Sequence, residues 1–194
     1  YILYAEIDGY DPTDKSLPAP ELTTMDKWVL SRLNSLVKKV REDLDEYKVT
    51  EPARAIQEFV DDLSNWYVRR CRERYWGSEM TADKSAAYNT LFTVLETLSR
   101  LLAPFTPFMA EAIYQNIVKS VDESAPESVH LCDYPEADTA LIDENLDVQM
   151  GYALRIVTLG RAARNASNVK TRQPLGLMML QADAELQPMF EEIV

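Results

Sequence analysis

The sequence has very few of the residues from which metal and nucleophilic sites are built. It contains two cysteines, Cys71 and Cys132, and a single histidine, His130. A structural zinc ion usually takes four Cys or His ligands, so a zinc site of that kind is excluded. One histidine cannot complete a convincing Ser-His-Asp set, and we predict neither a metal site nor a catalytic residue. We expect both cysteines to be free thiols of a cytoplasmic protein.

Glycine and long apolar runs are also scarce. Only five glycines are present, which disfavours a β-sandwich and a glycine-rich nucleotide-binding fold. No apolar run approaches the roughly 20 residues that a membrane-spanning helix needs, and no signal peptide opens the chain. Because the sequence begins with Tyr1 and ends at Val194 within a predicted element, we expect it to be part of a longer protein.

The composition is that of an ordinary globular protein, but its charge is uneven. Hydrophobic residues make up 46% and charged residues 27% of the 194 positions, enough for one or two domains with a core. A net charge of -12 argues against nucleic-acid binding by the surface as a whole. Two basic islands, residues 69–74 and the stretch 148–182 that lacks Asp and Glu, restrict where a polyanion could bind.

The stretch 63–76 combines two tryptophans, two tyrosines and four arginines in one predicted helix. At about 3.6 residues per turn its apolar side, which continues upstream, holds Phe59, Val60, Leu63, Tyr67 and Cys71. Arg70 and Arg74 lie near that side. Arginine beside aromatic rings suits RNA, through phosphate contacts and base stacking. A core of aromatics with arginines that complement the helix dipole explains the same pattern, and the spacing alone leaves both interpretations open.

Apolar periodicity predicts a mainly α fold, an antiparallel bundle of four to five helices. The end of a first helix is predicted near residue 8. The predicted helices that follow cover about residues 24–47, 50–76, 81–102, 107–119 and 143–166, and the third of these could also start at residue 78. The candidate caps are Thr24, Thr50, Thr81 or Ser78, Thr106, and Asp143 or Asn145. Asp26 falls in a first turn, and Gly77 ends the arginine-rich helix.

The apolar positions also predict which side chains form the core. In the first long helix they form a stripe from Met25 to Tyr47, and Trp28 and Trp66 are also predicted to be buried. The predicted core residues of the helix at 107–119 are Phe108, Ala112, Ile113 and Ile117. Those of the helix at 143–166 are Leu146, Met150, Ala153, Leu154 and Val157.

The last part of the chain changes its period and predicts the start of a small α+β module. Residues 175–180 form an apolar run of strand length, and 184–193 resemble the start of a helix. A lone strand is unstable, so we expect its partner beyond residue 194. The predicted domains are a junction at 1–22, a helical domain at 23–167 and a truncated module at 168–194.

Six short runs together resemble one family. They are DKWVLSRL (26–33), LSNWYVRR (63–70), LLAPFTPFMAE (101–111), SVHL (128–131), RAARN (161–165) and VKTRQPL (169–175). In this order they resemble the helical anticodon-binding domain of class I aminoacyl-tRNA synthetases for isoleucine, valine and leucine. The second and last runs are more similar to the isoleucyl type, whereas the PFTPF segment is shared with the valyl type.

The resemblance implies a tRNA partner, isoleucine-accepting, gripped at its anticodon stem-loop. It also implies a parent ligase that uses ATP and magnesium (Mg²⁺), acts as a monomer, and packs its catalytic and C-terminal domains on this bundle. The ATP-binding motifs of the family are absent here, so we predict no activity for this chain alone. The candidate RNA-binding residues are Arg69, Arg70, Arg72, Arg74, Trp76, Arg161, Arg164, Lys170 and Arg172. A valyl- or leucyl-type domain and a helical protein–protein scaffold are the alternatives.

Overall fold

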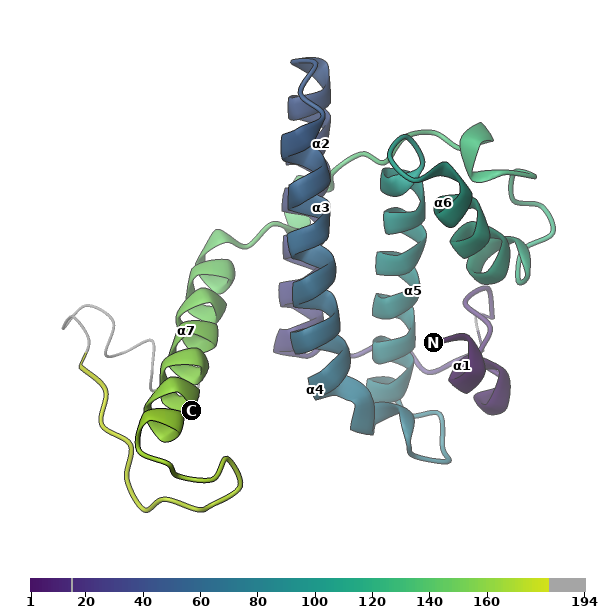
Figure 1. Cartoon of the computed structure of the whole chain (residues 1–194). Helices are drawn as coiled ribbons and strands as arrows, with labels where there is room; N and C mark the ends of the chain where they lie inside the picture. The colour runs from purple at the N-terminus through teal and green to yellow at the C-terminus, as the bar shows by residue number, and fades with distance from the viewer. Residues whose placement is uncertain (15, 182–194) are drawn as a thin grey trace. The chain divides into compact units, whose positions relative to one another are not determined.

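A computed structural model describes residues 1–14 and 16–181 of the chain. They belong to two compact units, Tyr1–Ile142 and Asp143–Val194, and each unit is considered by itself below. The first unit is a bundle of antiparallel helices (Figure 1), which confirms the predicted mainly α fold. In the described residues no helix is both long and apolar enough to cross a membrane. The helix expected at 184–193 lies outside the described residues.

The first long helix, α2 (Thr24–Asp45), begins with a capping box. The Thr23 hydroxyl accepts a hydrogen bond from the Asp26 amide at 3.3 Å, and the Asp26 carboxylate accepts one from the Thr23 amide at 2.9 Å. The predicted cap, Thr24, is therefore wrong by one position. Thr23 can cap the helix because its backbone is extended, which directs its side chain back toward the first turn.

The second long helix is a run of four segments without a break. It comprises α3 (Thr50–Asp62), the π-helical turn η1 (Leu63–Val68), α4 (Arg69–Cys71) and the 3-10 turn η2 (Arg72–Tyr75). The run ends just before Gly77, as predicted. Thr50 is not its cap, because the N-terminal boundary is Val49, in helical backbone, and no side chain caps the first turn.

The third long helix, α5 (Ala82–Leu102), is capped by Thr81, whose hydroxyl accepts a hydrogen bond from the Lys84 amide at 3.1 Å. A tight turn leads into α6 (Pro107–Tyr114), which continues as the π-helical turn η3 (Gln115–Lys119). Pro107 occupies the first helical position, as predicted. Thr106 precedes it but makes no side-chain capping bond.

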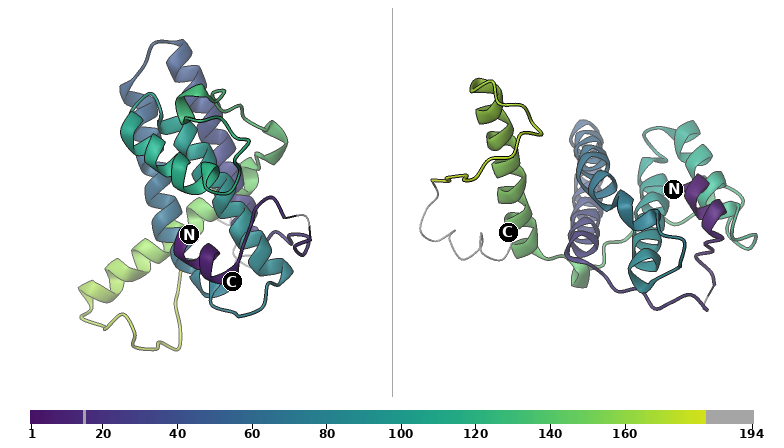
Figure 2. Two further views of the ribbon diagram at one scale, coloured as in Figure 1. Left: turned by 90° about the vertical axis from the view of Figure 1, so that its right-hand side faces the viewer. Right: turned by 90° about the horizontal axis from the view of Figure 1, so that it is seen from below.

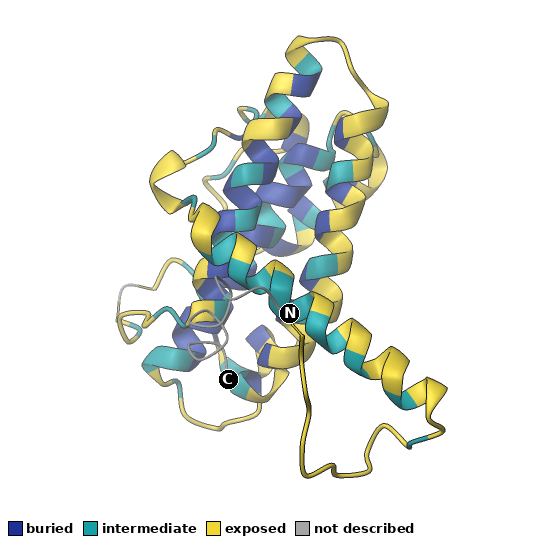
Figure 3. Ribbon diagram, turned by 90° about the vertical axis from the view of Figure 1, so that its left-hand side faces the viewer, coloured by how far each residue is buried: buried dark blue, intermediate teal, exposed yellow. Residues whose placement is uncertain are grey.

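The core lies where α2, the α3 run and α5 pack side by side, and the buried segments of these helices face one another in Figure 3. Its buried apolar side chains include Trp28, Val29, Leu33, Leu36, Val37, Val40, Ile56, Phe59, Leu63, Tyr67, Leu91, Val94, Leu98 and Leu101. A second cluster joins Ala110 and Tyr114 of α6 to Val129 of the short helix η4 (Val129–Leu131). The predicted stripe of α2 is thus confirmed for most of its length.

Several predicted core positions are wrong. Tyr47 is 95% exposed because its left-handed backbone, at φ 60°, turns the chain between α2 and α3. Phe108 is 91% exposed, since α6 packs through Ala110 and Tyr114 instead. Ala112 is exposed for the same reason. Val60 is 40% exposed, and it lies one residue round the helix from buried Phe59.

The N-terminal helix α1 (Ile2–Asp8) ends at Gly9, whose φ of 63° is the left-handed conformation that glycine adopts without strain. This confirms the helix tail predicted from the sequence. The segment packs on α5 (Figure 2). The Tyr10 ring stacks on the Tyr88 ring with centroids 4.6 Å apart, and the Tyr10 hydroxyl donates to Asn89 at 2.7 Å.

The segment after α6 runs along the bundle and is held by side chains of α2. The Arg41 guanidinium donates to the Pro135 carbonyl at 2.9 Å, and the Asn34 side chain accepts from the Asp138 amide at 2.8 Å. The short helices η4 and η5 (Thr139–Leu141) belong to this segment. Two side chains of α2 thus bind the last part of a connection that has little regular structure.

The second unit begins with α7 (Glu144–Ala166), capped by Asp143, whose side chain accepts from the Leu146 amide at 2.9 Å. Both ends of this helix were predicted from the sequence. No residue of α7 is fully buried. Residues 175–180 form no strand, contrary to the prediction, and they are exposed. A strand needs a hydrogen-bonding partner, and the described residues supply none.

Candidate nucleic-acid interface

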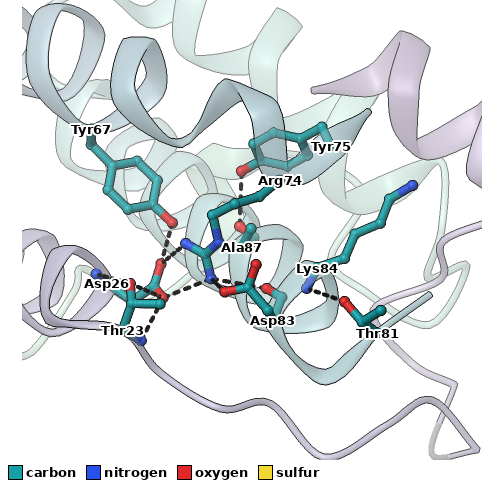
Figure 4. A network of polar contacts seen from close by, with 9 residues as sticks. All are labelled: Thr23, Asp26, Tyr67, Arg74, Tyr75, Thr81, Asp83, Lys84 and Ala87. Carbon is teal, nitrogen blue, oxygen red and sulfur yellow. Dashed lines mark hydrogen bonds and ion pairs between the residues drawn. The ribbon is translucent and has the colours of Figure 1, made fainter. Parts of the chain in front are cut away.

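Asp26 is the centre of a buried polar network that fixes the end of the arginine-rich helix (Figure 4). The Arg74 guanidinium donates to both carboxylate oxygens, at 2.8 and 2.9 Å, and the Tyr67 hydroxyl donates to one of them at 2.6 Å. Arg74 also forms an ion pair with Asp83 at 2.8 Å. The network therefore joins the start of α2, the end of the α3 run and the start of α5.

Hydrogen bonds keep the buried carboxylate of Asp26 ionised. Burial acts to raise the Asp26 pKa, but the donors from Arg74, Tyr67 and Thr23 outweigh it and hold the pKa below its usual value. Burial and the same carboxylate raise the pKa of Tyr67, so its hydroxyl stays protonated and donates. Asp26 and Arg74 thus form a buried ion pair that is also hydrogen-bonded.

Arg74, which the sequence suggested as an RNA contact, lies inside this network. Its side chain is 13% exposed. Its terminal nitrogens bond to the carboxylates of Asp26 and Asp83 and to the Asp83 carbonyl, 2.8 Å away. Two carboxylates already compensate the charge of this guanidinium, so a phosphate would gain little from contact with it. The structure therefore gives Arg74 a structural role.

The outer side of the same helix end carries the other arginines. Arg69, Arg70 and Arg72 are exposed, and Arg69 and Arg70 form no ion pair or side-chain hydrogen bond with any residue in 1–14 or 16–181. The Arg72 guanidinium carbon lies 5.5 Å from the centroid of the Trp76 ring. Trp76 is 57% exposed. This end of the helix thus presents cations and an accessible indole ring together.

The chemistry of this surface suits a single-stranded loop of RNA. A guanidinium over an indole face is held by a cation–π attraction, and an exposed ring gives an unpaired base a surface on which to stack. The unpaired guanidinium groups of Arg69 and Arg70 suit phosphate oxygens. We name the four residues Arg69, Arg70, Arg72 and Trp76 the arginine–tryptophan surface.

The opposite half of the same helix run has the opposite charge. Glu51, Glu58 and Asp61 are exposed there, while Asp62 is 3.4 Å from the Arg32 guanidinium. A polyanion is repelled by the acidic half and attracted to the basic end. On this helix run, the charge distribution therefore makes the arginine–tryptophan surface more attractive to a polyanion than the acidic half. It also complements the helix dipole, so both interpretations of the sequence pattern remain compatible with the fold.

The basic residues of the second unit lie on α7 and the loop after it. Arg164, which is half-buried, donates to the carbonyls of Lys170 and Gln173 at 3.1 and 2.8 Å. Lys170 and Arg172 are exposed on the loop, and Arg161 is exposed on the helix. Arg164 thus shapes the loop, whereas the Lys170 and Arg172 side chains face solvent.

Two buried charged residues that fix this geometry were not among the predicted site residues. The sequence marks Asp26 only as an acid in a first turn, and nothing marks Lys84, which is 2% exposed in α5. Their partners are distant in sequence, so no local pattern could have indicated the pairs. Among the described residues, no group of three or more His, Cys, Asp or Glu side chains could hold a metal ion.

Comparison with known proteins links this geometry to a family. The model of the anticodon-binding domain of tRNA ligase matches residues 26–179. The isoleucine–tRNA ligase of Clostridium novyi (strain NT) is 54% identical over 180 residues, which are 93% of this chain and 17% of that protein. That of Clostridium acetobutylicum is 55% identical over 185 residues, 95% of this chain and 18% of that protein.

A more distant organism gives the same result. The isoleucine–tRNA ligase of Thermus thermophilus is 49% identical over 189 residues, 96% of this chain and 18% of that protein. The chain thus spans less than a fifth of the length of these relatives. Because the family model matches most of the chain, and matches both the helix bundle and the basic loop, the chain belongs to the family of anticodon-binding domains of tRNA ligases.

Proposed function

We propose that this chain binds the anticodon stem-loop of an isoleucine-accepting tRNA on behalf of a larger isoleucine–tRNA ligase. The observation that carries the proposal is the exposed cation–π pair of Arg72 and Trp76, next to the unpaired Arg69 and Arg70. The relatives named isoleucine–tRNA ligase support the choice of amino acid. The valyl and leucyl types are the alternatives for that choice.

In this proposal the residues divide the work by their chemistry. Arg69 and Arg70 contact phosphates of the stem, where duplex RNA is recognised by its backbone and shape. Trp76 stacks on an unpaired loop base, and Arg72 supports the ring and adds a cation. In the second unit, Lys170, Arg172 and Arg161 contact phosphates, while Arg164 holds the loop.

The parent ligase supplies the chemistry. It charges the tRNA with isoleucine in the cytoplasm, at the cost of ATP and with Mg²⁺, in a catalytic domain that is not part of this sequence. This chain contributes tRNA binding and no catalytic residue. Residues 23–167 act as its helical domain, and the ligase is a monomer.

An apolar part of the surface supports packing against the rest of the parent. Phe108 and Met109 of α6 are 91% and 62% exposed, and Leu3 and Ile7 of α1 are 65% and 70% exposed. Exposed apolar patches often mark protein interfaces. We assign these side chains to contacts with the catalytic and C-terminal domains of the same ligase. The same observation favours the second candidate, a protein–protein scaffold, which would be indifferent to tRNA.

Direct binding separates the two candidates. We would titrate the chain with an isoleucine tRNA and an unrelated tRNA, at low and at physiological salt, and follow fluorescence anisotropy. The proposal predicts binding of the isoleucine tRNA that weakens steeply with salt, because phosphate contacts release counterions. Equal binding of both tRNAs would assign base reading to other domains of the ligase. No binding at low salt would favour the scaffold.

A further inference from the structure

Lys84 is a buried cation that contacts two separate parts of the first unit. Its ammonium group, in a side chain 3% exposed, lies 2.6 Å from the Asp8 carboxylate at the end of α1. It also donates to the carbonyl of Gly77 at 2.5 Å. Gly77 directly follows Trp76, so one ammonium group joins the N-terminal helix to the residue beside the exposed indole ring.

Side chains of three residues connect the end of the arginine-rich helix to its surroundings. Arg74 is bonded to Asp26, and the Tyr75 hydroxyl donates to the Ala87 carbonyl at 3.0 Å. The third side chain is that of Lys84, which bonds to Gly77. Figure 4 shows Arg74, Tyr75 and Lys84 around the start of α5. Arg74 and Tyr75 precede Trp76 in the chain, and Lys84 bonds to the residue that follows it.

The docking of α1 depends on the same ammonium group. The Asp8 carboxylate takes hydrogen bonds from Lys84 and from the Tyr88 hydroxyl, and these outweigh burial, so the Asp8 pKa lies below its usual value. The Tyr10 ring completes the contact by stacking on Tyr88. The carboxylate is the charged partner that makes a buried Lys84 ammonium favourable.

We propose that Lys84 is a positioning residue through which the docking of α1 sets the position of Trp76. The tRNA part of this inference rests on the proposed function, in which Trp76 stacks on a base. When α1 is docked, Asp8 holds the ammonium inside the protein, where it bonds to Gly77. When Asp8 is removed or displaced, the buried ammonium has no charged partner and turns toward water. The Gly77 carbonyl then loses its donor, which frees Trp76.

The first test follows Trp76 without any RNA. The chain contains three tryptophans, Trp28, Trp66 and Trp76, which we would label as 5-fluorotryptophan and assign through Trp76→Phe. We expect Asp8→Asn to shift and narrow the ¹⁹F resonance of Trp76 while that of buried Trp28 stays in place. The matched control is Glu6→Gln, an exposed residue of the same helix with the same change of charge. A Trp76 resonance unaltered in Asp8→Asn would overturn the proposal.

A second variant guards against a loss of folding. In Asp8→Asn/Lys84→Met both charges of the ion pair are gone, and replacing a buried ion pair by neutral groups is often tolerated. This variant also lacks the donor to Gly77, so the Trp76 resonance is expected to shift as it does in Asp8→Asn. A folded double variant in which Trp76 has its original resonance would contradict the role of Lys84.

The second test compares the tRNA affinities of two variants that each lose one negative charge. Removing a negative charge ordinarily strengthens binding to a polyanion, so Glu6→Gln should leave the affinity for isoleucine tRNA unchanged or slightly higher. We expect Asp8→Asn to weaken it by roughly 2- to 30-fold, the range of long-range couplings. Stronger tRNA binding by Asp8→Asn would overturn the coupling. A shifted Trp76 resonance in a chain that binds no tRNA would uphold the positioning role and refute the proposed function.

Discussion

Arg72 and Arg74 are two positions apart in the same 3-10 turn, yet they have opposite surroundings. Arg74 points inward to a carboxylate with no exposed surface, and Arg72 lies outside against a tryptophan ring. The energetic consequence differs accordingly. Removing one partner of a buried ion pair leaves an uncompensated charge, whereas replacing an exposed side chain usually changes little.

This difference predicts the stabilities of two arginine variants. We expect Arg74→Ala to lower the free energy of unfolding by about 3–5 kcal/mol, because Asp26 is left buried and unpaired. Arg70→Ala, four positions earlier and exposed, should change it by less than about 0.5 kcal/mol. Urea denaturation followed by circular dichroism measures both. Equal midpoints for the two variants would show that the Asp26 network does not hold the helix end.

The Asp26 carboxylate also predicts a pH dependence. Its pKa is lowered in the folded chain, whereas an unfolded Asp titrates near about 3.9. Its stabilisation is therefore complete above the unfolded pKa and is lost as the pH falls through the folded one. We expect the melting temperature of the chain to fall more steeply below about pH 4 than that of Asp26→Asn. Parallel curves for the two proteins would contradict this assignment.

At the scale of elements, one side chain of α7 holds the loop that follows the helix. The Arg164 guanidinium bridges the carbonyls of Lys170 and Gln173, which fixes the backbone from which Lys170 and Arg172 project. Arginine is suited to this role because its planar group presents several donors at once. A lysine at this position would keep the positive charge but could not bond to both carbonyls in the same way.

Arg164 should therefore affect tRNA binding through the loop and not through charge alone. We expect Arg164→Lys, which keeps the charge, to weaken binding and to speed amide hydrogen exchange in residues 169–175. Arg155→Ala, which removes an exposed charge from the same helix, should leave exchange in this loop unchanged. If Arg164→Lys showed the hydrogen exchange and tRNA affinity of the unchanged chain, Arg164 would contribute to binding through its charge alone.

The ends of the elements could be predicted because local residues specify them. Pro107, Thr81 and Asp143 each act within one turn of their own position. The ties between elements could not be predicted in this way. Asp26 and Arg74 are 48 positions apart, and nothing near either residue in the sequence indicates the other. The same holds for Lys84 and Asp8.

The candidate site was predictable to the same extent. The composition of residues 63–76 indicated an arginine-rich surface with aromatic rings, and Arg69, Arg70, Arg72 and Trp76 are exposed. The sequence could not separate Arg74 from its neighbours, because the separation depends on a carboxylate from another helix. Phe108 shows the converse. Its apolar character predicted burial, but only the packing of α6 decides which of its faces is covered.

At the scale of the molecule, the chain carries a net charge of -12, and the acidic half of the α3 run repels a polyanion. In the proposed function, the basic end of that run in the first unit and the loop after α7 in the second unit provide the attraction. Affinity in such a protein should depend on a few cations and fall steeply with salt. The affinity should not be determined by the total number of positive charges on the chain.

The most direct test compares three variants in isoleucine-tRNA binding over a series of salt concentrations. Trp76→Ala should weaken binding by about 1–3 kcal/mol, the value of one stacked base, without changing the salt dependence. Arg70→Ala should lower the slope of log affinity against log salt by about one, for one lost phosphate contact.

The control is Arg54→Ala, an exposed arginine of the same helix run, at roughly 27 Å from Arg72 along the helix. The account predicts that it changes neither the affinity nor the slope. If Arg54→Ala weakened binding as much as Arg70→Ala, while Trp76→Ala had no effect, the arginine–tryptophan surface would not be the tRNA-binding site.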